Sequence, residues 1–329
     1  MLSKKNNILI IGNGSGGHFY PSFTVANELN KLGYNIHYAV ASNRLDEKII
    51  KNTNYKYISL PYVGYNKNSV KFISQLFKNI KDIKEYIENE NIKVIIGFGG
   101  GLSFSCIVAG MLNGCNVIVH EQNAVFGRAN NLIKNKVHML VSHKNIKGYK
   151  FVGNPVVNTN PIKKNNFFDI IIVFGSQGSQ SLNNIFIEFL KEYKEKHKIL
   201  FVSNTKHKFS NKNIVVKEYI KDLKSYFSNT RLVFTRGGAT TLAELSCFEC
   251  KVCIIPSPYV VNDHQMKNAI EFKKEYGSEI IREKDLTTEK INSVILNNLN
   301  EFKRHNNRIK IEKNNYLDLF IKEIQNEIS

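Results

Sequence analysis

Hydrophobic residues gather along the chain in short, unbroken runs, and each run leads through a polar or glycine-rich turn into a stretch of helical character. Apolar runs without alternation are typical of strands that are buried on both faces. Strands that alternate with helices over the whole length predict parallel sheets of the doubly wound α/β kind. The predicted strands are Ile8–Ile11, Ile36–Val40, Val94–Ile96, Val117–Val119, Met139–Val141, Ile170–Phe174, Ile199–Val202, Leu232–Phe234 and Val252–Ile255.

The alternating pattern restarts once, near the middle of the 329 residues. Residues 148–168 are polar, contain two prolines and several asparagines, and are predicted to be a linker. The strand that follows opens a glycine-rich turn, as the first strand of the chain does. We therefore expect two Rossmann-like domains with an interdomain cleft, residues 1–155 and 156–305, and a helical tail over residues 306–329.

A glycine-rich loop follows the first predicted strand, where Gly12, Gly14 and Gly17 match the G-x-G-x-x-G pattern. Backbone N–H groups of such a loop, and of the helix after it, can approach a phosphate closely. A nicotinamide-dependent oxidoreductase also needs an acidic residue after the second strand, and residues 39–43 (AVASN) contain none. A lone histidine is most often structural, but His18 follows the glycines directly, which makes it a candidate general base.

Two more polar or glycine-rich segments follow strands in the first half. Residues 97–103 (GFGGGLS) are either a second loop that approaches a ligand or, as we favour, a tight turn between strand and helix. Residues 120–123 (HEQN) place four polar side chains at the end of a strand, where burial without partners is costly. We expect those side chains to face the cleft or to form a hydrogen-bond network.

The second half carries its own candidate ligand loops. Ser176, Gln177 and the helix after them are suited to cradle a diphosphate. A helix is predicted to start near Ala239–Thr241, and Glu244 either accepts two ribose hydroxyls or is a favourable acid in a first turn. Gln265 lies among polar residues that suit sugar hydroxyls or helix capping.

No metal is predicted. Cys247, Cys250 and Cys253 have the C-x-x-C-x-x-C spacing of some iron–sulfur sites, but they span a helix end and a strand and should not converge. Buried apolar thiols explain them better. The sequence has no D-x-D triplet, which argues against a sugar transferase that chelates a metal.

The formal net charge of +18 suits an anionic membrane surface, a phosphorylated substrate or nucleic acid, although solubility alone would also explain it. Residues 70–87 are predicted to form a basic amphipathic helix that either packs on a sheet or dips into an anionic bilayer. We find no signal peptide and no apolar run near the ~18 residues of a spanning helix. Five cysteines without secreted-domain spacing fit a reducing compartment, so we expect a cytoplasmic or peripheral protein.

Seven motifs occur in a fixed order: GSGGH, GFGG, HEQN, GNP, GSQGS, GGATTLAE and HQ-x-x-NA. Together they resemble the MurG family of bacterial cell-wall glycosyltransferases over essentially the whole chain. The resemblance implies a GT-B fold of two Rossmann-like domains, with the acceptor and the membrane at the first, UDP-sugar mainly at the second, and the last helix packed on the first. It also implies a peripheral enzyme on the cytoplasmic face of the cell membrane, which serves peptidoglycan synthesis and through it cell wall biogenesis, cell shape and cell division.

The implied reaction moves N-acetylglucosamine from UDP-N-acetylglucosamine to undecaprenyl-diphospho-muramoyl-pentapeptide with inversion, the step from lipid I to lipid II, without cofactor or metal. His18 matches the proposed base, oriented by neighbours near Glu121. The residues implied to bind substrate are Ser15, Gly16 and Gly17 in the first loop, Asn123 at the sugar, Ser176 near the diphosphate, Ile220 beside the uracil, Ala239, Thr240, Thr241, Leu242, Ala243 and Glu244 at phosphate and ribose, and Gln265 at the sugar hydroxyls.

The chain departs from the family pattern after GNP, where Val157 stands in place of an arginine, so Lys163 or Arg236 would have to supply the positive charge. Other departures are Ser15 for threonine, Asn13 for glycine, Gly101 for tyrosine and Cys250 for glycine. The alternatives are another GT-B transferase that glycosylates a lipid from a UDP-sugar, the nicotinamide-dependent oxidoreductase, and a nucleic-acid-binding protein, for which only the net charge speaks.

Overall fold

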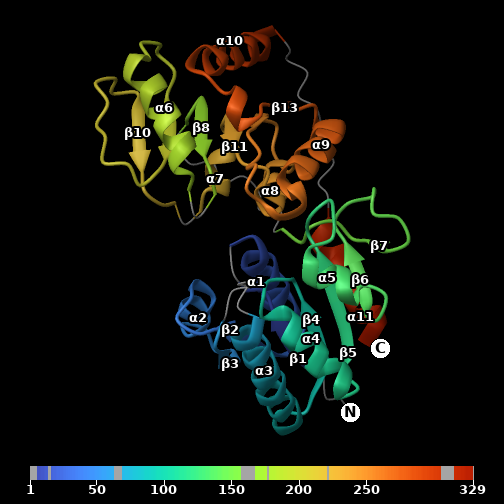
Figure 1. Cartoon of the computed structure of the whole chain (residues 1–329). Helices are drawn as coiled ribbons and strands as arrows, with labels where there is room; N and C mark the ends of the chain where they lie inside the picture. The colour runs from blue at the N-terminus through green and yellow to red at the C-terminus, as the bar shows by residue number, and fades with distance from the viewer. Residues whose placement is uncertain are drawn as a thin grey trace. The chain divides into compact units, whose positions relative to one another are not determined.

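The computed structural model describes residues 6–13, 16–62, 69–156, 167–175, 178–220, 222–304 and 315–328. The chain divides into two compact units (Figure 1). Unit 1 comprises residues 1–157 and 315–329, and unit 2 comprises residues 158–314. Each unit is built on one parallel sheet with helices on both faces, so the predicted doubly wound α/β class is confirmed.

The sheet of unit 1 has the strand order β3-β2-β1-β4-β5-β6-β7, and all neighbouring strands are parallel. Strand β1, in the interior of the sheet, is apolar without alternation because helices cover both faces, and its residues Ile8–Ile11 are completely buried. The strands are β1 Asn7–Ile11, β2 Asn35–Ala41, β3 Lys56–Leu60, β4 Ile92–Gly97, β5 Asn116–Glu121, β6 His138–Val141 and β7 Lys150–Phe151.

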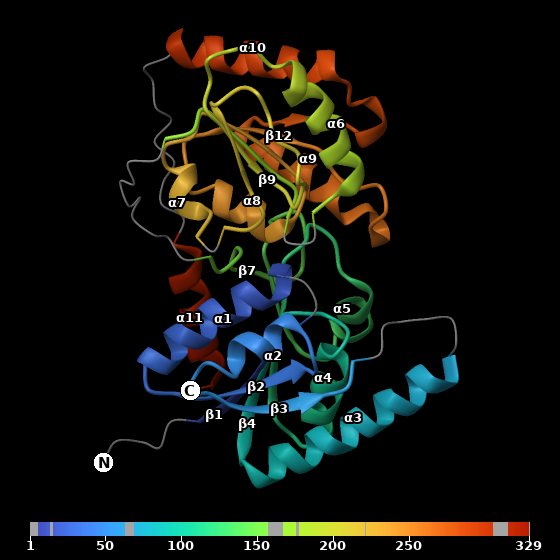
Figure 2. The same cartoon turned by 90° about the vertical axis from the view of Figure 1, so that its left-hand side faces the viewer.

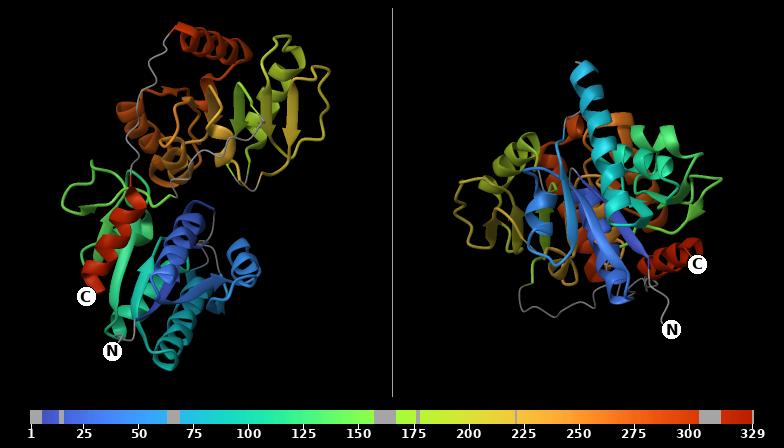
Figure 3. Two further views of the ribbon diagram at one scale, coloured as in Figure 1. Left: turned by 180° about the vertical axis from the view of Figure 1, so that it is seen from behind. Right: turned by 90° about the horizontal axis from the view of Figure 1, so that it is seen from below.

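Two groups of helices cover this sheet. The helices of unit 1 are α1 Gly16–Lys31, α2 Leu45–Ile50, α3 Ser69–Asn89, α4 Ser103–Leu112, α5 Arg128–Ile133 and α11 Tyr316–Ile328. Phe19 of α1 and Phe320 of α11 belong to the core on one face, where Figure 3 shows the two helices side by side. Ile83 of α3, Ile107 of α4 and Ile133 of α5 belong to the core on the other face.

The sheet of unit 2 has the order β10-β9-β8-β11-β12-β13, again parallel throughout. Its strands are β8 Ile170–Val173, β9 Ile199–Val202, β10 Ile214–Lys217, β11 Leu232–Thr235, β12 Lys251–Ile254 and β13 Glu279–Ile280. Helices α6 Gln180–Glu192 and α10 Thr288–Arg304 lie together on one face (Figure 2). The other face carries α7 Lys224–Phe227, α8 Ala239–Leu245 and α9 His264–Tyr276, and two short 3-10 turns span Val261–Asp263 and Glu283–Asp285.

All nine predicted strands are present, but β3, β7, β10 and β13 were not predicted. Each of these four lies at or next to a sheet edge, where at least one side of the strand stays partly exposed. Their sequences therefore lack the unbroken apolar run that marks a central strand. The predicted amphipathic helix 70–87 is confirmed as α3.

The predicted linker 148–168 is wrong at both ends. Strand β7 pairs with β6, and Val152, Asn154 and Val156 are buried in unit 1. Phe168 already belongs to the core of unit 2. Polar and proline residues misled the interpretation because this segment satisfies its backbone by pairing at the sheet edge; residues 157–166 lie outside the described residues.

Strand order decides where a site can form. In unit 1 the chain proceeds from β1 outward to β3 and then returns to β4 on the other side of β1, and unit 2 repeats this at β8 and β11. Loops that leave the carboxyl ends of strands on either side of such a reversal diverge and open a crevice, where α/β proteins bind ligands. The loops after β1, β4 and β5 meet at this edge in unit 1, and those after β8, β11 and β12 meet at it in unit 2.

Candidate active site

His18 lies in the first turn of α1, directly beyond the carboxyl end of β1. Its Nδ1 is 2.9 Å from Oε1 of Gln122, which comes from the end of β5. The predicted neighbour near Glu121 is therefore Gln122, one residue further along. The histidine ring also lies against Gly99, where an added Cβ would be 3.2 Å from Cε1. Three loops from three strands thus hold one imidazole at the crevice.

The glycines of residues 97–103 serve more than a tight turn, which was the favoured interpretation. Gly100 has φ +94, and an added Cβ would lie 2.2 Å from Oδ1 of Asn13 in the first glycine-rich loop. Gly99 likewise has φ +87 beside His18. A side chain at either position would be strained and would displace the loop that carries the imidazole. A side chain at Gly101 is excluded by a different contact, because an added Cβ would lie 2.5 Å from the ring of Tyr62.

The carboxylate of Glu121 organises the loop after β5. Its Oε1 accepts hydrogen bonds from the backbone and side-chain nitrogens of Asn123, both at 3.0 Å. Its Oε2 accepts from the backbone of Gly127 at 2.9 Å and from Nδ2 of Asn130 at 2.8 Å. Glu121 is buried, and these four bonds satisfy both of its carboxyl oxygens there. The loop therefore presents Asn123, a predicted sugar contact, in one orientation.

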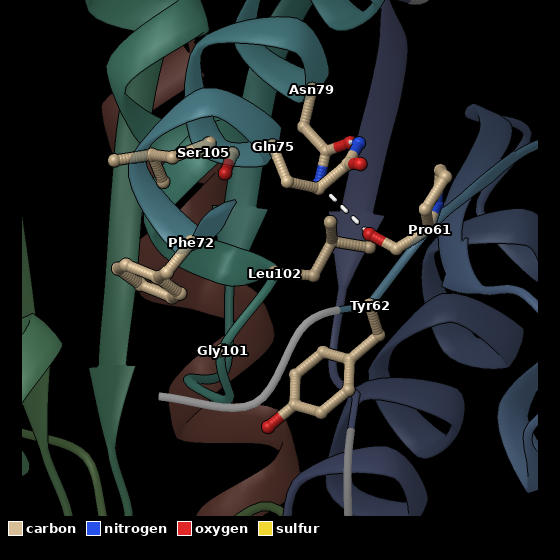
Figure 4. Close-up of a pocket in the computed structure, with 9 residues that line it drawn as sticks. Pro61, Tyr62, Phe72, Gln75, Asn79, Gly101, Leu102 and Ser105 are labelled. Atoms are coloured by element: carbon tan, nitrogen blue, oxygen red, sulfur yellow. Dashed lines mark hydrogen bonds between the residues drawn. The ribbon is translucent and has the colours of Figure 1, made fainter. Parts of the chain in front are cut away.

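A small pocket opens beside the glycine-rich loop of residues 97–103, between α3 and the start of α4 (Figure 4). It contains about 250 Å³ of space, part of it open to solvent. Phe72 and Gln75 from α3 face Tyr62 and Gly101 across it, and Asn79 donates a hydrogen bond of 3.0 Å to the Pro61 carbonyl. The pocket combines apolar walls with the amide groups of Gln75 and Asn79.

Helix α3 exposes large apolar side chains next to lysines. Val70, Ile73 and Phe77 are 80%, 47% and 66% exposed, and their spacing puts them along one side of the helix. Lys71, Lys78 and Lys81 are exposed on the same helix. Among the helices that the structure describes, none is both long and apolar enough to cross a bilayer.

The donor half predicted in unit 2 centres on α8, which begins at Ala239 as predicted. Gly237 is required by a close approach, since an added Cβ would lie 2.2 Å from the Gln265 carbonyl oxygen. No side chain caps the helix at Gly238. Leu242 is a core residue whose N–H donates to the Gly238 carbonyl, so packing explains it without a ligand.

Glu244 lies near the carboxyl end of α8, not in its first turn. The helix dipole disfavours an acid there, which removes the simple capping interpretation. The pKa of Glu244 is raised to about 7, chiefly by burial, while the nearby Lys224 lowers it and Asp222 makes a smaller contribution that raises it. The ionised carboxylate of Glu244 is thus unfavourable for stability, and a carboxylate with such a perturbed pKa is a candidate ligand-binding group.

Ile220 and Gln265 both have structural partners. Ile220 is half-buried against the core beneath α7 and α8. Oε1 of Gln265 accepts a 2.8 Å hydrogen bond from the Ser257 backbone, so this oxygen holds the loop after β12 and does not cap α9. Ser15 and Ser176, with Gly14 and Gln177, lie outside the described residues. Gly16 and Gly17 open α1.

Arg236 is not available to replace the arginine missing at Val157. Its guanidinium lies 2.6 Å from a carboxylate oxygen of Glu283 and donates to Oγ of Ser179, also at 2.6 Å. Ser179 is the N-cap of α6, so Arg236 anchors the helix that follows the predicted diphosphate loop. Sequence reasoning missed this role because its partners lie 57 and 47 residues away. Val157 and Lys163 lie outside the described residues.

Two groups of side chains in the described part of the chain are candidate metal ligands. Burial raises the pKa of the thiols of Cys247, Cys250 and Cys253, which is typical of packed cysteines. His138 of β6 lies 3.7 Å from Glu323 and 3.5 Å from Glu327, both on α11. Lys150 also pairs with Glu323 at 3.2 Å. We interpret this second cluster as polar contacts, among them the Lys150–Glu323 ion pair, that fasten α11 to the sheet.

Comparison with known proteins places the chain in a family. Residues 8–142 match the glycosyltransferase family 28 N-terminal domain, and residues 170–324 match the glycosyltransferase family 28 C-terminal domain. One relative from Thermosipho africanus is 32% identical and covers 98% of both chains. Another from Bacillus cytotoxicus is 30% identical and covers 89% of both. Both are named UDP-N-acetylglucosamine–N-acetylmuramyl-(pentapeptide) pyrophosphoryl-undecaprenol N-acetylglucosamine transferase.

The crystal structure of MurG from Acinetobacter baumannii superposes with a TM-score of 0.74 at 21% identity, and covers 98% of this chain and 99% of that one. This likeness confirms the GT-B fold of two Rossmann-like units. Two family models together cover most of the chain, and the relatives match it almost from end to end. The chain therefore belongs to glycosyltransferase family 28 and, within it, to the MurG family of N-acetylglucosamine transferases.

Proposed function

We propose that this protein transfers N-acetylglucosamine from UDP-N-acetylglucosamine to undecaprenyl-diphospho-muramoyl-pentapeptide, which converts lipid I into lipid II in peptidoglycan synthesis. The nearly full-length similarity to relatives named for this reaction carries the proposal. The position of His18 where three strands end supports it, because a base is needed at the crevice.

In the acceptor half, Nε2 of His18 takes the proton of the attacking sugar hydroxyl. The hydroxyl oxygen forms a bond to the anomeric carbon from the face opposite the leaving group. The bond from that carbon to the diphosphate oxygen breaks, and its electron pair leaves with UDP. The configuration at the anomeric carbon is therefore inverted. Asn123, held by Glu121, contacts the transferred sugar.

In the donor half, the loop at Ser176 and the backbone of Ala239–Thr241 stabilise the charge that develops on the leaving diphosphate. Glu244, when ionised, accepts hydrogen bonds from the two ribose hydroxyls. Ile220 packs beside the uracil, and the amide nitrogen of Gln265 donates to the sugar while its oxygen holds the Ser257 loop.

The protein acts on the cytoplasmic face of the membrane as a peripheral enzyme. Its acceptor carries a lipid, and α3 offers exposed Val70, Ile73 and Phe77 beside lysines, which suits insertion at an anionic surface. The pocket between α3 and the glycine loop would receive polar and apolar groups of the acceptor. Nucleic acid is not a partner, since no feature beyond net charge favours it.

The deciding experiment measures UDP release from UDP-N-acetylglucosamine, with and without lipid-linked muramoyl-pentapeptide. Acceptor-dependent release, with a lipid-linked disaccharide as product, is expected. Tight UDP binding without that transfer would contradict the proposed acceptor and favour another glycolipid. Failure to bind UDP would contradict the donor as well.

A further inference from the structure

Three hydrogen bonds connect His18 to a backbone carbonyl in the interior of unit 1. Nδ1 of His18 faces Oε1 of Gln122 at 2.9 Å. Nε2 of Gln122 faces Nδ1 of His120 at 3.1 Å. Nε2 of His120 faces the carbonyl oxygen of Gly153 at 3.0 Å. His120 and Gln122 are both completely or almost completely buried, so these contacts are their means of satisfying polar atoms.

The Gly153 carbonyl, at the inner end of this series of hydrogen bonds, fixes which group donates in each bond. A carbonyl oxygen can only accept, so Nε2 of His120 must carry a hydrogen. Ser142 agrees with this, because its hydroxyl donates to the same carbonyl at 3.2 Å and its oxygen lies 2.9 Å from Nε2 of His120. Burial lowers the pKa of His120 to about 3, which leaves the ring neutral. Its Nδ1 is therefore an acceptor.

The amide of Gln122 is oriented twice by independent acceptors. Its Nε2 donates to Nδ1 of His120 and also, at 3.2 Å, to the backbone carbonyl of His120. Both contacts turn the nitrogen end inward, so the oxygen end must face His18. An amide oxygen is an acceptor only. The hydrogen of a neutral His18 therefore sits on Nδ1, and Nε2 has the lone pair.

Helix α11 encloses the inner end of the chain. The ring of Phe320 stands edge-on to His120 with centroids 5.0 Å apart, and Phe98 lies 5.5 Å away on β4's loop. Tyr316 covers Gly153, where φ is +72 and an added Cβ would lie 2.2 Å from the Tyr316 ring. The titratable groups that act on His120 are His143 and His18, and no carboxylate is among them. The surroundings thus keep His120 uncharged.

We propose that Gln122 is a positioning residue that sets the tautomer of His18, so that Nδ1 carries the hydrogen and Nε2 accepts the proton of the acceptor hydroxyl. The direction of these hydrogen bonds is set by the Gly153 carbonyl, which can only accept, and His120 relays that direction to Gln122. The opposite amide orientation would put a donor against Nδ1 and the hydrogen on Nε2, where His18 cannot act as a base. This inference rests on the proposed role of His18.

The test uses the full chain with ¹⁵N-labelled histidine. NMR shifts of the two ring nitrogens distinguish the tautomers, and the signal that is lost in His18→Asn assigns His18 among the nine histidines. We expect hydrogen on Nδ1 in the wild type. Gln122→Met keeps the length of the side chain but neither donates nor accepts, so its His18 should shift towards the Nε2–H form. A dominant Nε2–H tautomer in the wild type would overturn the proposal without any variant.

Turnover separates positioning from folding. Gln122→Met should lower kcat by about tenfold to a hundredfold, as loss of an orienting hydrogen bond typically does, while UDP affinity stays the same. Gln122→Glu can still accept from Nδ1 of His18, and its protonated second oxygen can donate to His120 as the amide does, so it should retain more activity than Gln122→Met. An unchanged tautomer and kcat in Gln122→Met would contradict the proposal. An unchanged kcat in His18→Asn would instead contradict the proposed function.

Discussion

The carboxylate of Glu244 lies 3.9 Å from the ammonium of Lys224. Burial and Asp222 raise the pKa of Glu244, and Lys224 opposes them, so that the carboxyl group titrates at about 7. A group that must be ionised to accept two hydroxyls therefore changes its charge in the physiological range. If Glu244 accepts the ribose hydroxyls, as we propose, this balance makes donor binding sensitive to pH.

We expect affinity for UDP-N-acetylglucosamine to increase by about tenfold between pH 6 and pH 8, as a pKa of about 7 requires if only ionised Glu244 binds ribose. The diphosphate of this ligand is esterified at both ends, so the ligand itself does not titrate in this range. Calorimetry at several pH values measures the effect. Glu244→Gln should bind weakly with a flat profile, and a sloping profile in this variant would assign the pH dependence elsewhere.

Lys224 provides the matched control. Lys224→Met removes the charge that lowers the pKa of Glu244, so the midpoint of binding should move to higher pH, whereas Lys224→Arg should leave the midpoint nearly unchanged.

The stability of the fold depends on pH in the opposite direction to donor binding. Because the folded pKa lies above the ordinary 4.5, the contribution of Glu244 to stability is full below pH 4.5 and is lost as pH rises through about 7.

The glycine loop can be tested with two glycines that share a positive φ. Gly114→Ala has open space around the new Cβ, so it should cost about 1–2 kcal/mol of unfolding free energy from strain alone and leave kcat unchanged. Gly100→Ala should cost more and should lower kcat, because its Cβ displaces Asn13 next to the loop that touches His18. Equal behaviour of the two variants in denaturant titration and turnover would refute the close-contact argument.

The ion pair of Arg236 and Glu283 is largely buried, so breaking it from one side should be severe. Arg236→Met leaves the Glu283 carboxylate without its guanidinium and should cost about 3–5 kcal/mol of unfolding free energy. Adding Glu283→Leu should recover part of that loss, since no uncompensated charge remains. Denaturant titration checks both. A double variant less stable than Arg236→Met would show that the two residues do not act as a pair.

Charge reversal on α3 tests the proposed membrane surface. Lys78→Glu with Lys81→Glu should weaken binding to anionic vesicles by more than roughly thirtyfold at low salt, since loss of two lysines near such a surface removes about 2 kcal/mol and the surface repels the two new carboxylates. Activity on a soluble acceptor should not change. Lys194→Glu with Lys196→Glu, which reverses two exposed lysines of unit 2, is the matched control. Equal vesicle affinity for the two double variants would mean that α3 packs on the sheet and does not bind the membrane.

His18→Ala should lower kcat by about 10²–10⁴-fold, the usual contribution of a general base, with little change in UDP affinity. Unit 2 should hold UDP without the imidazole, so equilibrium binding of UDP is the internal control. Turnover at the wild-type level would remove His18 from the mechanism.

The unbroken apolar runs made the central strands predictable, because residues such as Ile8–Ile11 and Ile170–Val173 are buried on both faces. Edge strands such as Ile214–Lys217 carry only a weak signal, since pairing to a neighbour stabilises them more than their own composition does. The segment after Lys150 was misjudged for the same reason.

The HEQN motif shows where local reasoning reaches its limit. Its side chains were predicted to face the cleft or to form a hydrogen-bond network, but a division into two networks was not predicted. Side chains alternate across a strand, so His120 and Gln122 lie towards His18 and Gly153 while Glu121 and Asn123 form the loop network. Gly153 is 33 residues from His120, and His18 is 104 residues from Gln122, so only the fold brings these partners together.

Helix α11 follows the whole of unit 2 in sequence, yet it packs in unit 1 and covers His120. On the ribosome, the half that carries His18 therefore emerges first and is completed last. Until residues 316–328 are made, the nascent half exposes the apolar face that Phe320 later fills, and the inner histidine stays in contact with water. If His18 is the base, as we propose, its imidazole would thus acquire its working state only after unit 2 has been synthesised.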